Sequence, residues 1–119
     1  MKARRAWLTA ALAGPLAGLA LAASTEADWF AAAQAGDQTT LQRLAAAGVP
    51  VDQRDSRGRT ALLVATHADR VEAARWLIAR GADVNAKDDI QDSPFLYAGA
   101  EGRLEILRLT LAAGADLAS

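Results

Sequence analysis

The stretch DSRGRTALLVATHADRVEAARWLIARGADVNAK, residues 55–87, decides the fold of this sequence. It contains two segments with helical patterning, joined by a short turn and bounded at each end by another turn. The same outline begins again directly after it, and a blurred copy precedes it. Gly48, Gly81 and Gly114 recur at an interval of 33 residues. A fixed period of this length, with two helices in each unit, predicts a solenoid of stacked helix pairs.

Short motifs within this period resemble those of the ankyrin repeat family. Residues 55–60 (DSRGRT) are similar to its D-x-x-G-x-T hairpin and helix start, and residues 102–109 (GRLEILRL) resemble its second-helix opening, G-x-x-E-I-V-x-L. Residues 81–86 (GADVNA) and 114–117 (GADL) resemble its G-A-D-V-N-A ending. The resemblance extends over roughly residues 25–119. It implies an all-α ankyrin-repeat solenoid of about three helix-turn-helix repeats with hairpin-like loops.

The chain divides into a leader and an array of repeats. We expect a helical signal peptide at residues 1–22 and ankyrin repeats at 23–119. The array consists of a degenerate N-terminal capping repeat at about 24–54 and full repeats at 55–87 and 88–119. Terminal repeats normally carry a polar outer face, and the last repeat lacks one. This favours a fragment of a longer array, with a self-associating end or a natural short form as alternatives.

Residues 1–22 have the features of a secretory leader. Lys2, Arg4 and Arg5 give a positive start, residues 6–22 are largely apolar, and residues 20–22 (ALA) fit the small-x-small cleavage rule. The leader predicts a periplasmic or secreted protein exported by the general secretory route. The two arginines also resemble a twin-arginine signal, although the flanking residues do not complete that motif.

An uncleaved leader is the competing interpretation, and it would make the protein a membrane-tethered structural scaffold. The apolar run is short and rich in alanine, whereas a stable span needs about 20 strongly apolar residues. We therefore expect no stable membrane span in the mature form. The N-terminus of the purified protein decides, because a chain that starts near Ala23 has lost the tether.

Composition excludes several kinds of site. The chain has no cysteine, which removes disulfides, thiolate metal sites and cysteine nucleophiles. Its formal net charge is −1, and the part after the leader is more acidic, whereas a nucleic-acid binder would show a basic face. His67 is the only histidine and has no nucleophile or orienting carboxylate beside it in sequence. We therefore expect no enzyme activity, cofactor, metal, nucleic acid or small-molecule substrate.

A calcium site at residues 88–92 is a weaker alternative to a solvated loop. Three aspartates occur there, but the glycine and the distal bidentate glutamate of a dedicated calcium loop are absent.

Local signals predict where helices begin. Thr60 is expected to cap a helix at 61–68, and Ser93-Pro94 combines a capping hydroxyl with proline at the first helical position. Ser24 or Thr25 is expected to cap a helix at 26–35.

Hairpin and core positions are also predicted by the period. Gly58 supplies the left-handed residue of the second repeat's turn, and Gln91 stands in its place in the third, so the third hairpin should be strained or rebuilt. Leu62 and Leu77 are expected to face inward. The third repeat contributes an inward set of five residues: Phe95, Ala98, Leu104, Leu107 and Leu111. Of these, Phe95, Leu107 and Leu111 are expected to be partly open to water. Thr110 replaces the apolar residue that matches Leu77, so its helix should pack less well. Trp76 is interpreted as core, with an exposed convex-side anchor as the alternative.

The resemblance implies protein binding through the hairpin tips and the inner faces of the first helices, which line a concave surface. Carried over to matching positions, that surface comprises Arg54, Ser56, Arg57, Arg59, His67 and Ala68 from the second repeat, and Lys87, Asp89, Ile90, Asp92, Ala100 and Glu101 from the third. The expected partner is a periplasmic protein, such as an enzyme that this protein supports or inhibits.

Ile90 has two interpretations at an exposed tip. An apolar residue ringed by polar groups suits a binding anchor. Alternatively, Ile90 folds back onto the neighbouring hairpin to compensate for Gln91.

Overall fold

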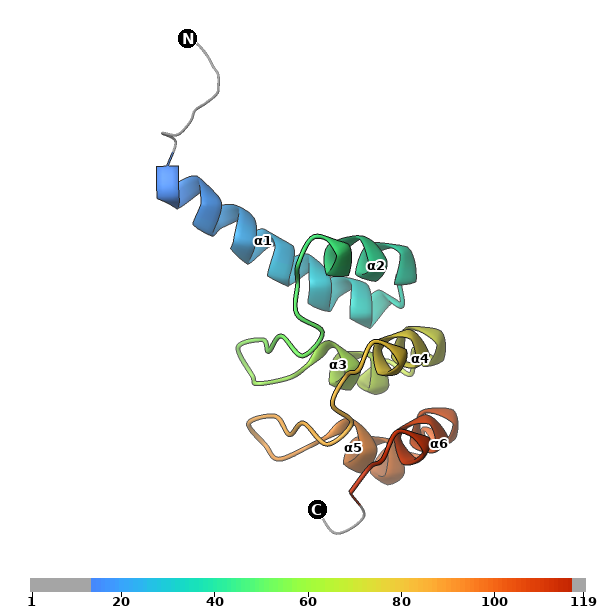
Figure 1. Ribbon diagram of the computed structural model, residues 1–119. Coiled ribbons are helices and arrows are strands. Elements are labelled where there is room, and N and C mark those ends of the chain that lie inside the picture. The colour runs from blue at the N-terminus through green and yellow to red at the C-terminus, as the bar shows by residue number, and fades with distance from the viewer. Residues whose placement is uncertain (1–13, 117–119) are drawn as a thin grey trace.

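The computed structural model describes the backbone of residues 14–116 and the side chains of residues 25–116, and within that range it contains helices and no strand. The helices form three stacked pairs (Figure 1). In chain order they are α1 (Gly14–Ala35), α2 (Gln38–Ala46), α3 (Ala61–His67), α4 (Val71–Ala79), α5 (Pro94–Glu101) and α6 (Leu104–Ala112). The predicted all-α fold is confirmed.

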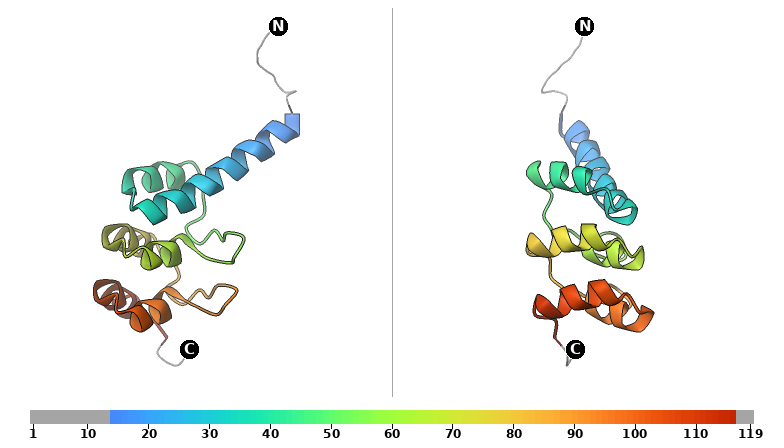
Figure 2. Two further views of the ribbon diagram at one scale, coloured as in Figure 1. Left: turned by 180° about the vertical axis from the view of Figure 1, so that it is seen from behind. Right: turned by 90° about the vertical axis from the view of Figure 1, so that its right-hand side faces the viewer.

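The pairs stack so that like helices contact like helices. The first helices α1, α3 and α5 form one layer, and the second helices α2, α4 and α6 form another. The long loops that precede α3 and α5 project side by side from the same edge of the stack (Figure 2). This arrangement follows from the period, because each helix pair hides its apolar face only by packing against the next pair.

The predicted caps of the second and third repeats are confirmed. Thr60 Oγ1 accepts the N–H of Leu63 at 3.3 Å, and Ser93 Oγ accepts the N–H of Leu96 at 3.1 Å. Pro94 occupies the first helical position, where its missing N–H is not needed. Each hydroxyl satisfies one donor that a helix start otherwise leaves unpaired.

The predicted start of the first helix is wrong. α1 begins at Gly14 and runs without a break to Ala35, so residues 24 and 25 lie inside the helix and do not cap it. Alanine and leucine, which dominate residues 16–23, are strong helix formers, so the helix continues through the two hydroxyl residues. Residues 1–13 of the predicted signal peptide lie outside the described residues. In the described range, no helix combines the length and apolar character needed to cross a membrane.

A left-handed residue joins the two helices of each pair. Gly36, Asp69 and Gly102 have φ of 72°, 56° and 71°. Asp69 therefore fills a glycine position as predicted, since aspartate tolerates this conformation better than most residues.

An arginine ties each pair to the one before it. Arg70 Nε donates to the carbonyl of Gln34 at 2.9 Å, and Arg103 Nη2 donates to the carbonyl of His67 at 3.2 Å. Both bonds link residues 36 positions apart, so the same junction is built twice.

The core runs through all three pairs. Leu62 and Leu77 are fully buried, as predicted, and belong to one apolar cluster with Trp29. Trp76 packs against that cluster, edge to face with Trp29 at a centroid distance of 6.4 Å, which favours the core interpretation. Phe95 is half-buried.

The inward face of α6 was partly mispredicted. Leu104, which was expected to face inward, is 62% exposed, whereas the 44% exposure of Leu111 agrees with a residue partly open to water. Ile106 and Thr110 are fully buried instead, and their four-residue spacing defines the inner stripe of the helix. Thr110 Oγ1 donates to the carbonyl of Leu107 at 2.8 Å, so the hydroxyl that interrupts the apolar pattern is hydrogen-bonded where it is buried.

Candidate functional site

An aspartate organises each projecting hairpin. Asp55 Oδ1 accepts the backbone N–H groups of Arg57 and Arg59, both at 2.9 Å. One period later, Asp88 Oδ1 accepts the N–H groups of Ile90 and Asp92 at 3.1 and 2.9 Å. The two tips therefore have the same internal framework and present equivalent residues side by side.

The acidity of Asp55 reflects this framework. Burial alone would raise the pKa of Asp55, but hydrogen bonds from the N–H groups of Arg59 and Arg57 and the guanidinium of Arg59 outweigh it and lower the pKa. The carboxylate is therefore charged at neutral pH, as its role of acceptor requires.

The third hairpin is strained and is not rebuilt. Gln91 adopts φ 67°, close to the 75° of Gly58. Gln91 N–H reaches the carbonyl of Asp88 at 3.0 Å, and Gly58 N–H reaches that of Asp55 at the same distance. A residue with a Cβ is strained at φ > 0, whereas glycine adopts this conformation without strain.

Gln91→Gly is expected to raise the free energy of unfolding by about 0.5–1 kcal/mol, since relief of the left-handed strain exceeds the added freedom of the unfolded chain. Urea unfolding followed by circular dichroism measures the change. Gln91→Ala keeps a Cβ in the strained position and should leave stability nearly unchanged. A destabilised Gln91→Gly variant would show that the glutamine side chain contributes a contact larger than the strain.

Backbone and side-chain bonds lock the two hairpins together. Asp89 N–H donates to the carbonyl of Arg57 at 3.0 Å. Arg54 Nη1 donates to the carbonyl of Gly58 at 2.8 Å and also to that of Lys87 in the next repeat. The tips therefore form one continuous surface, and the guanidinium of Arg54 is engaged in the hydrogen bonds that hold it together.

Further bonds join the bases of successive loops. Asp52 Oδ1 accepts the N–H of Asp83 at 3.0 Å, and Asn85 Oδ1 accepts the N–H of Asp116 at 2.7 Å. The acceptors are one period apart and so are the donors, so both loop bases are held in the same way.

A groove of about 370 Å³ lies at the hairpins and the end of α3. The residues that line this hairpin groove are Arg57, Arg59, His67, Asp88, Asp89 and Ile90. All of them except Asp88 belong to the predicted surface. Asp88 was missed because it reads as a turn residue, although it recurs one period after Asp55.

The remaining predicted surface residues lie around the groove or away from it. Arg54 and Ser56 are exposed beside it, and Lys87 and Asp92 are half-buried. Ala68 is half-buried at the end of α3, while Ala100 and Glu101 are exposed at the end of α5. The structure therefore brings the hairpin residues together and leaves Ala100 and Glu101 outside the groove lining.

His67 is held against a residue that the sequence did not single out. Its ring stacks on Tyr97 with 3.8 Å between centroids and 15° between planes. His67 Nε2 is buried and has no hydrogen-bond partner within the described residues. Tyr97 lies on the first helix of the following repeat, so the stack joins α3 to α5. Its position one period after Val64, facing the end of α3, is the signal that could have found it.

Burial of His67 lowers its pKa from the ordinary value of 6.5. Arg59 and Arg103 lower the pKa further, while Asp92 and Asp88 act in the opposite direction. The neutral imidazole is therefore the form that fits the stack.

We expect the protein to lose stability as pH falls through 6.5, because the unfolded chain then takes up a proton at His67 before the folded chain does. The contribution of neutral His67 to the free energy of unfolding is fully present above that pH. It stops falling once the pH is below the pKa of His67 in the folded chain. Chemical unfolding at pH 7.5 and 5.5 measures the difference. His67→Phe keeps an aromatic ring for the stack and should remove the dependence in this interval. An equal dependence in that variant would assign it to other groups.

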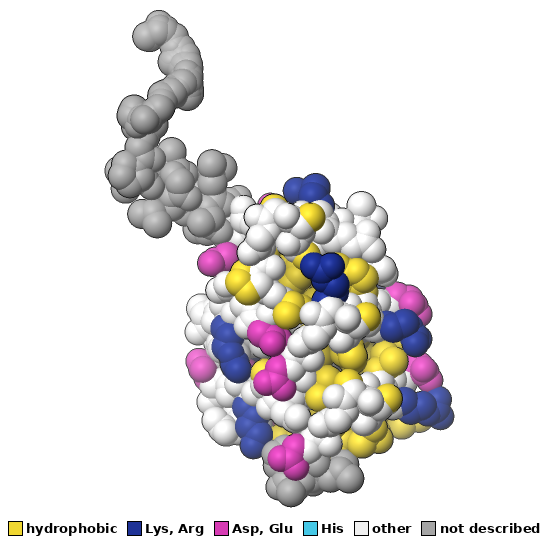
Figure 3. All heavy atoms as spheres, viewed as in Figure 1, with side chains coloured by type: hydrophobic (Ala, Val, Ile, Leu, Met, Phe, Trp, Pro, Cys, Tyr) yellow, Lys and Arg dark blue, Asp and Glu magenta, His cyan; other side chains and the backbone are white. Residues whose placement is uncertain are grey.

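Charges of both signs are mixed on the face seen in Figure 3. Lysine and arginine side chains alternate there with aspartate and glutamate, with apolar side chains between them. No group of three or more metal-ligating residues occurs within the described residues. The aspartates at 88–92 thus do not form a metal cluster in the described structure.

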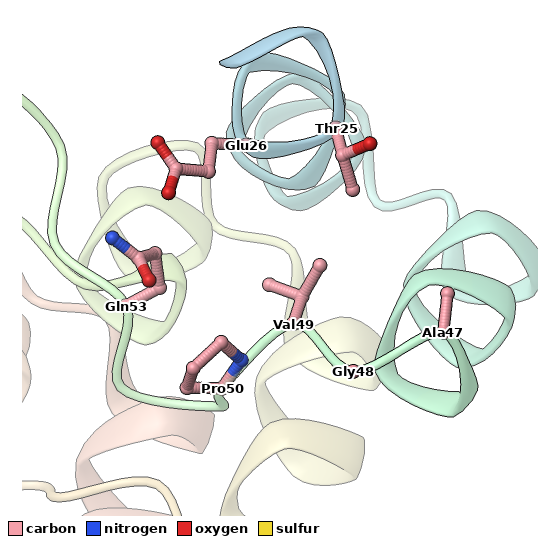
Figure 4. A pocket seen from close by; sticks show the side chains of 7 residues that line it. All are labelled: Thr25, Glu26, Ala47, Gly48, Val49, Pro50 and Gln53. Atoms are coloured by element: carbon pink, nitrogen blue, oxygen red, sulfur yellow. The ribbon is translucent and has the colours of Figure 1, made fainter. Parts of the chain in front are cut away.

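A second hollow of about 270 Å³ lies between α1 and the loop after α2 (Figure 4). Its lining includes the polar residues Thr25, Glu26 and Gln53, with an otherwise small and apolar set: Ala47, Gly48, Val49 and Pro50. Gln53 Nε2 donates to the carbonyl of Arg54 at 3.4 Å. The Thr25 hydroxyl and the Glu26 carboxylate point away from one another (Figure 4), so the lining shows no nucleophile-base pair.

Comparison with known proteins gives a consistent result. The family model described as Ankyrin repeats (3 copies) matches residues 29–119. The crystal structure of an ankyrin repeat domain from Acinetobacter baumannii AYE is similar, with a TM-score of 0.75 and 52% sequence identity. The match covers 79% of this chain and 48% of that chain, so it spans about half of the solved chain. The comparison with curated proteins gave no match.

Proposed function

The chain belongs to the ankyrin repeat family, and we propose that it binds a periplasmic protein through the concave side of the stack. Ankyrin repeats are in general protein–protein interaction modules and are typically not catalytic. The proposed surface consists of the hairpin tips and the neighbouring faces of α3 and α5. It acts by shape and charge complementarity and performs no reaction.

The rigid pairing of the two hairpins is the observation that carries the proposal. Hydrogen bonds between Asp89 and Arg57, and between Arg54 and Lys87, fix the tips before any partner arrives. A surface that is already ordered loses little conformational entropy on binding. The hairpin groove supplies the hollow into which a partner's side chains can fit.

A double substitution tests the surface. Arg57→Glu with Ile90→Asp should abolish recovery of the partner from periplasmic extract. Arg43→Glu with Leu104→Asp makes the same chemical changes at two exposed positions outside the groove and should retain recovery. Circular dichroism and thermal unfolding confirm that both variants fold. Equal recovery by the two variants would reject this surface.

The periplasmic or secreted location rests on the leader-like composition of residues 1–22. Cell fractionation followed by mass spectrometry of the intact protein tests it. A protein that starts near Ala23 in the periplasmic fraction is the expected result. An intact N-terminus in the membrane fraction would replace the proposal with the tethered scaffold, and a cytoplasmic protein would reject export.

A further inference from the structure

We infer that the partner segment presents an acidic side chain to Arg57 and an apolar side chain to Ile90. This inference rests on the proposed function and specifies the chemistry of its partner. It follows from which groups of the hairpins are used internally and which face outward unpaired.

The three arginines of the second hairpin are not equivalent. Arg54 donates to two backbone carbonyls, and Arg59 Nε pairs with Asp55 Oδ2 at 2.8 Å. Arg57 is exposed, and its guanidinium has no hydrogen-bond or ion-pair partner in the described part of the chain. One cation of the three is therefore available, with donors in a planar fork that suits a carboxylate.

Most acidic residues of the hairpins are buried or half-buried, and only Asp89 is exposed. Asp55 and Asp88 accept the N–H groups of their own turns. Asp89 is exposed, but its Oδ1 lies against the second hairpin, 2.6 Å from where a Cβ on Gly58 would stand. Asp92 is half-buried, and its charge partly opposes the lowering of the His67 pKa by burial. Three of the four hairpin carboxylates are therefore occupied or half-buried and the fourth lies against the second hairpin, whereas the guanidinium of Arg57 is exposed and unpaired within the described residues.

Ile90 is the most exposed large apolar side chain among the described residues, at 75%. It does not fold back onto the neighbouring hairpin, so the compensation considered for Gln91 does not occur. Binding an apolar side chain over the exposed isoleucine is favourable, because it removes apolar surface from water.

Arg57 and Ile90 hold equivalent places in successive hairpins. Both follow an organising aspartate by two residues, and the bond between Asp89 and Arg57 keeps the tips adjacent. Packed helices lie about 8–10 Å apart, which sets the spacing of the repeats. One short segment of a partner can therefore reach both positions.

A nucleic-acid phosphate could also pair with Arg57, but the surroundings disfavour it. Protein surfaces that bind nucleic acid are strongly basic, whereas four aspartates lie in these two hairpins. A phosphate also offers nothing apolar to Ile90. A protein segment meets both requirements.

Selection from a phage-displayed library of random peptides tests the inference on the full chain. Enriched peptides should share an aspartate or glutamate at a fixed distance from a large apolar residue. Their affinity, measured by fluorescence polarisation of synthetic copies, should fall about tenfold with Arg57→Glu and with Ile90→Asp, since central charges and apolar anchors dominate such contacts. When the Arg57→Glu variant is used as the target of the selection, lysine or arginine should be enriched in place of the acid.

The outcomes separate this inference from the function on which it rests. Peptides that lack a shared acid, or that bind Arg57→Glu as well as the original chain, would overturn the inference. If those peptides still lost affinity with His67→Ala, protein binding at the hairpin groove would stand. Peptides insensitive to every groove substitution would reject both. If a single-stranded oligonucleotide at equal concentration displaced the peptides, nucleic acid would be the occupant of this surface and the inference of a protein segment would be wrong. Arg43→Glu is the matched control for a change of net charge.

Discussion

Leu62→Ala is expected to lower the free energy of unfolding by about 3–4 kcal/mol, through lost apolar burial and the cavity left behind. Leu62 is fully buried in α3, the central first helix, which contacts α1, α4 and α5. Domains of this size are stable by only about 5–15 kcal/mol, so the loss is a substantial share of the total. Urea unfolding followed by circular dichroism at 222 nm measures the loss.

Leu104→Ala is the matched control for this prediction. Leu104 is 62% exposed at the start of α6, so the same substitution should change stability by less than about 0.5 kcal/mol. Equal effects at the two positions would mean that the stack is not organised around α3 in solution.

Gly58→Ala is expected to cost about 2–3 kcal/mol, because two separate penalties add. Gly58 has φ 75°, which L-residues adopt at a cost. A Cβ there would also stand 2.6 Å from Asp89 Oδ1 and 3.3 Å from the Asp89 backbone nitrogen. The side chain can turn away, but the backbone nitrogen of Asp89 must also shift slightly, which weakens the contact between the hairpins.

Gly102→Ala separates the two penalties. Gly102 has a similar φ of 71°, but no atom lies within 4 Å of an added Cβ. This variant should lose only about 1 kcal/mol, the strain alone. If Gly58→Ala lost no more than Gly102→Ala, the two hairpins would not be in close contact in solution.

The period predicted the fold because it repeats signals that act locally. Thr60 and Ser93 cap helices through hydroxyls three residues from their donors, and such a short-range bond can be recognised from sequence. Asp37 caps α2 in the same way, with its side chain accepting the N–H of Thr40 at 3.2 Å, and the same reasoning could have found it.

The errors occurred where a local signal competed with its neighbours. Residues 24 and 25 can cap a helix, but the helix-forming stretch before them continues through. Leu104 was assigned inward because it is apolar, whereas the spacing of Ile106 and Thr110 defines the buried stripe. Because Thr110 is polar, the apolar pattern of that stripe is interrupted and could not be recognised from the sequence.

The candidate site was predicted as a set of positions without their interactions. Sequence placed Arg54, Arg57 and Arg59 together at one tip, but which of them pairs internally depends on the folded positions of Lys87 and Asp55. Likewise, the contact between His67 and Tyr97 crosses from one repeat to the next. Such pairings between repeats depend on the stacking distance, which the sequence does not contain.

Because Asp89 approaches Gly58 closely, the two hairpins differ in how well a further repeat can stack against them. The second hairpin accepts a neighbour beneath it because its turn carries no Cβ where Asp89 approaches. The third hairpin has the same backbone but places the Cβ of Gln91 there. A duplicate of it, stacked one repeat further on, would meet that atom with the same close approach. A longer array made by copying this unit should therefore pack better with glycine at position 91.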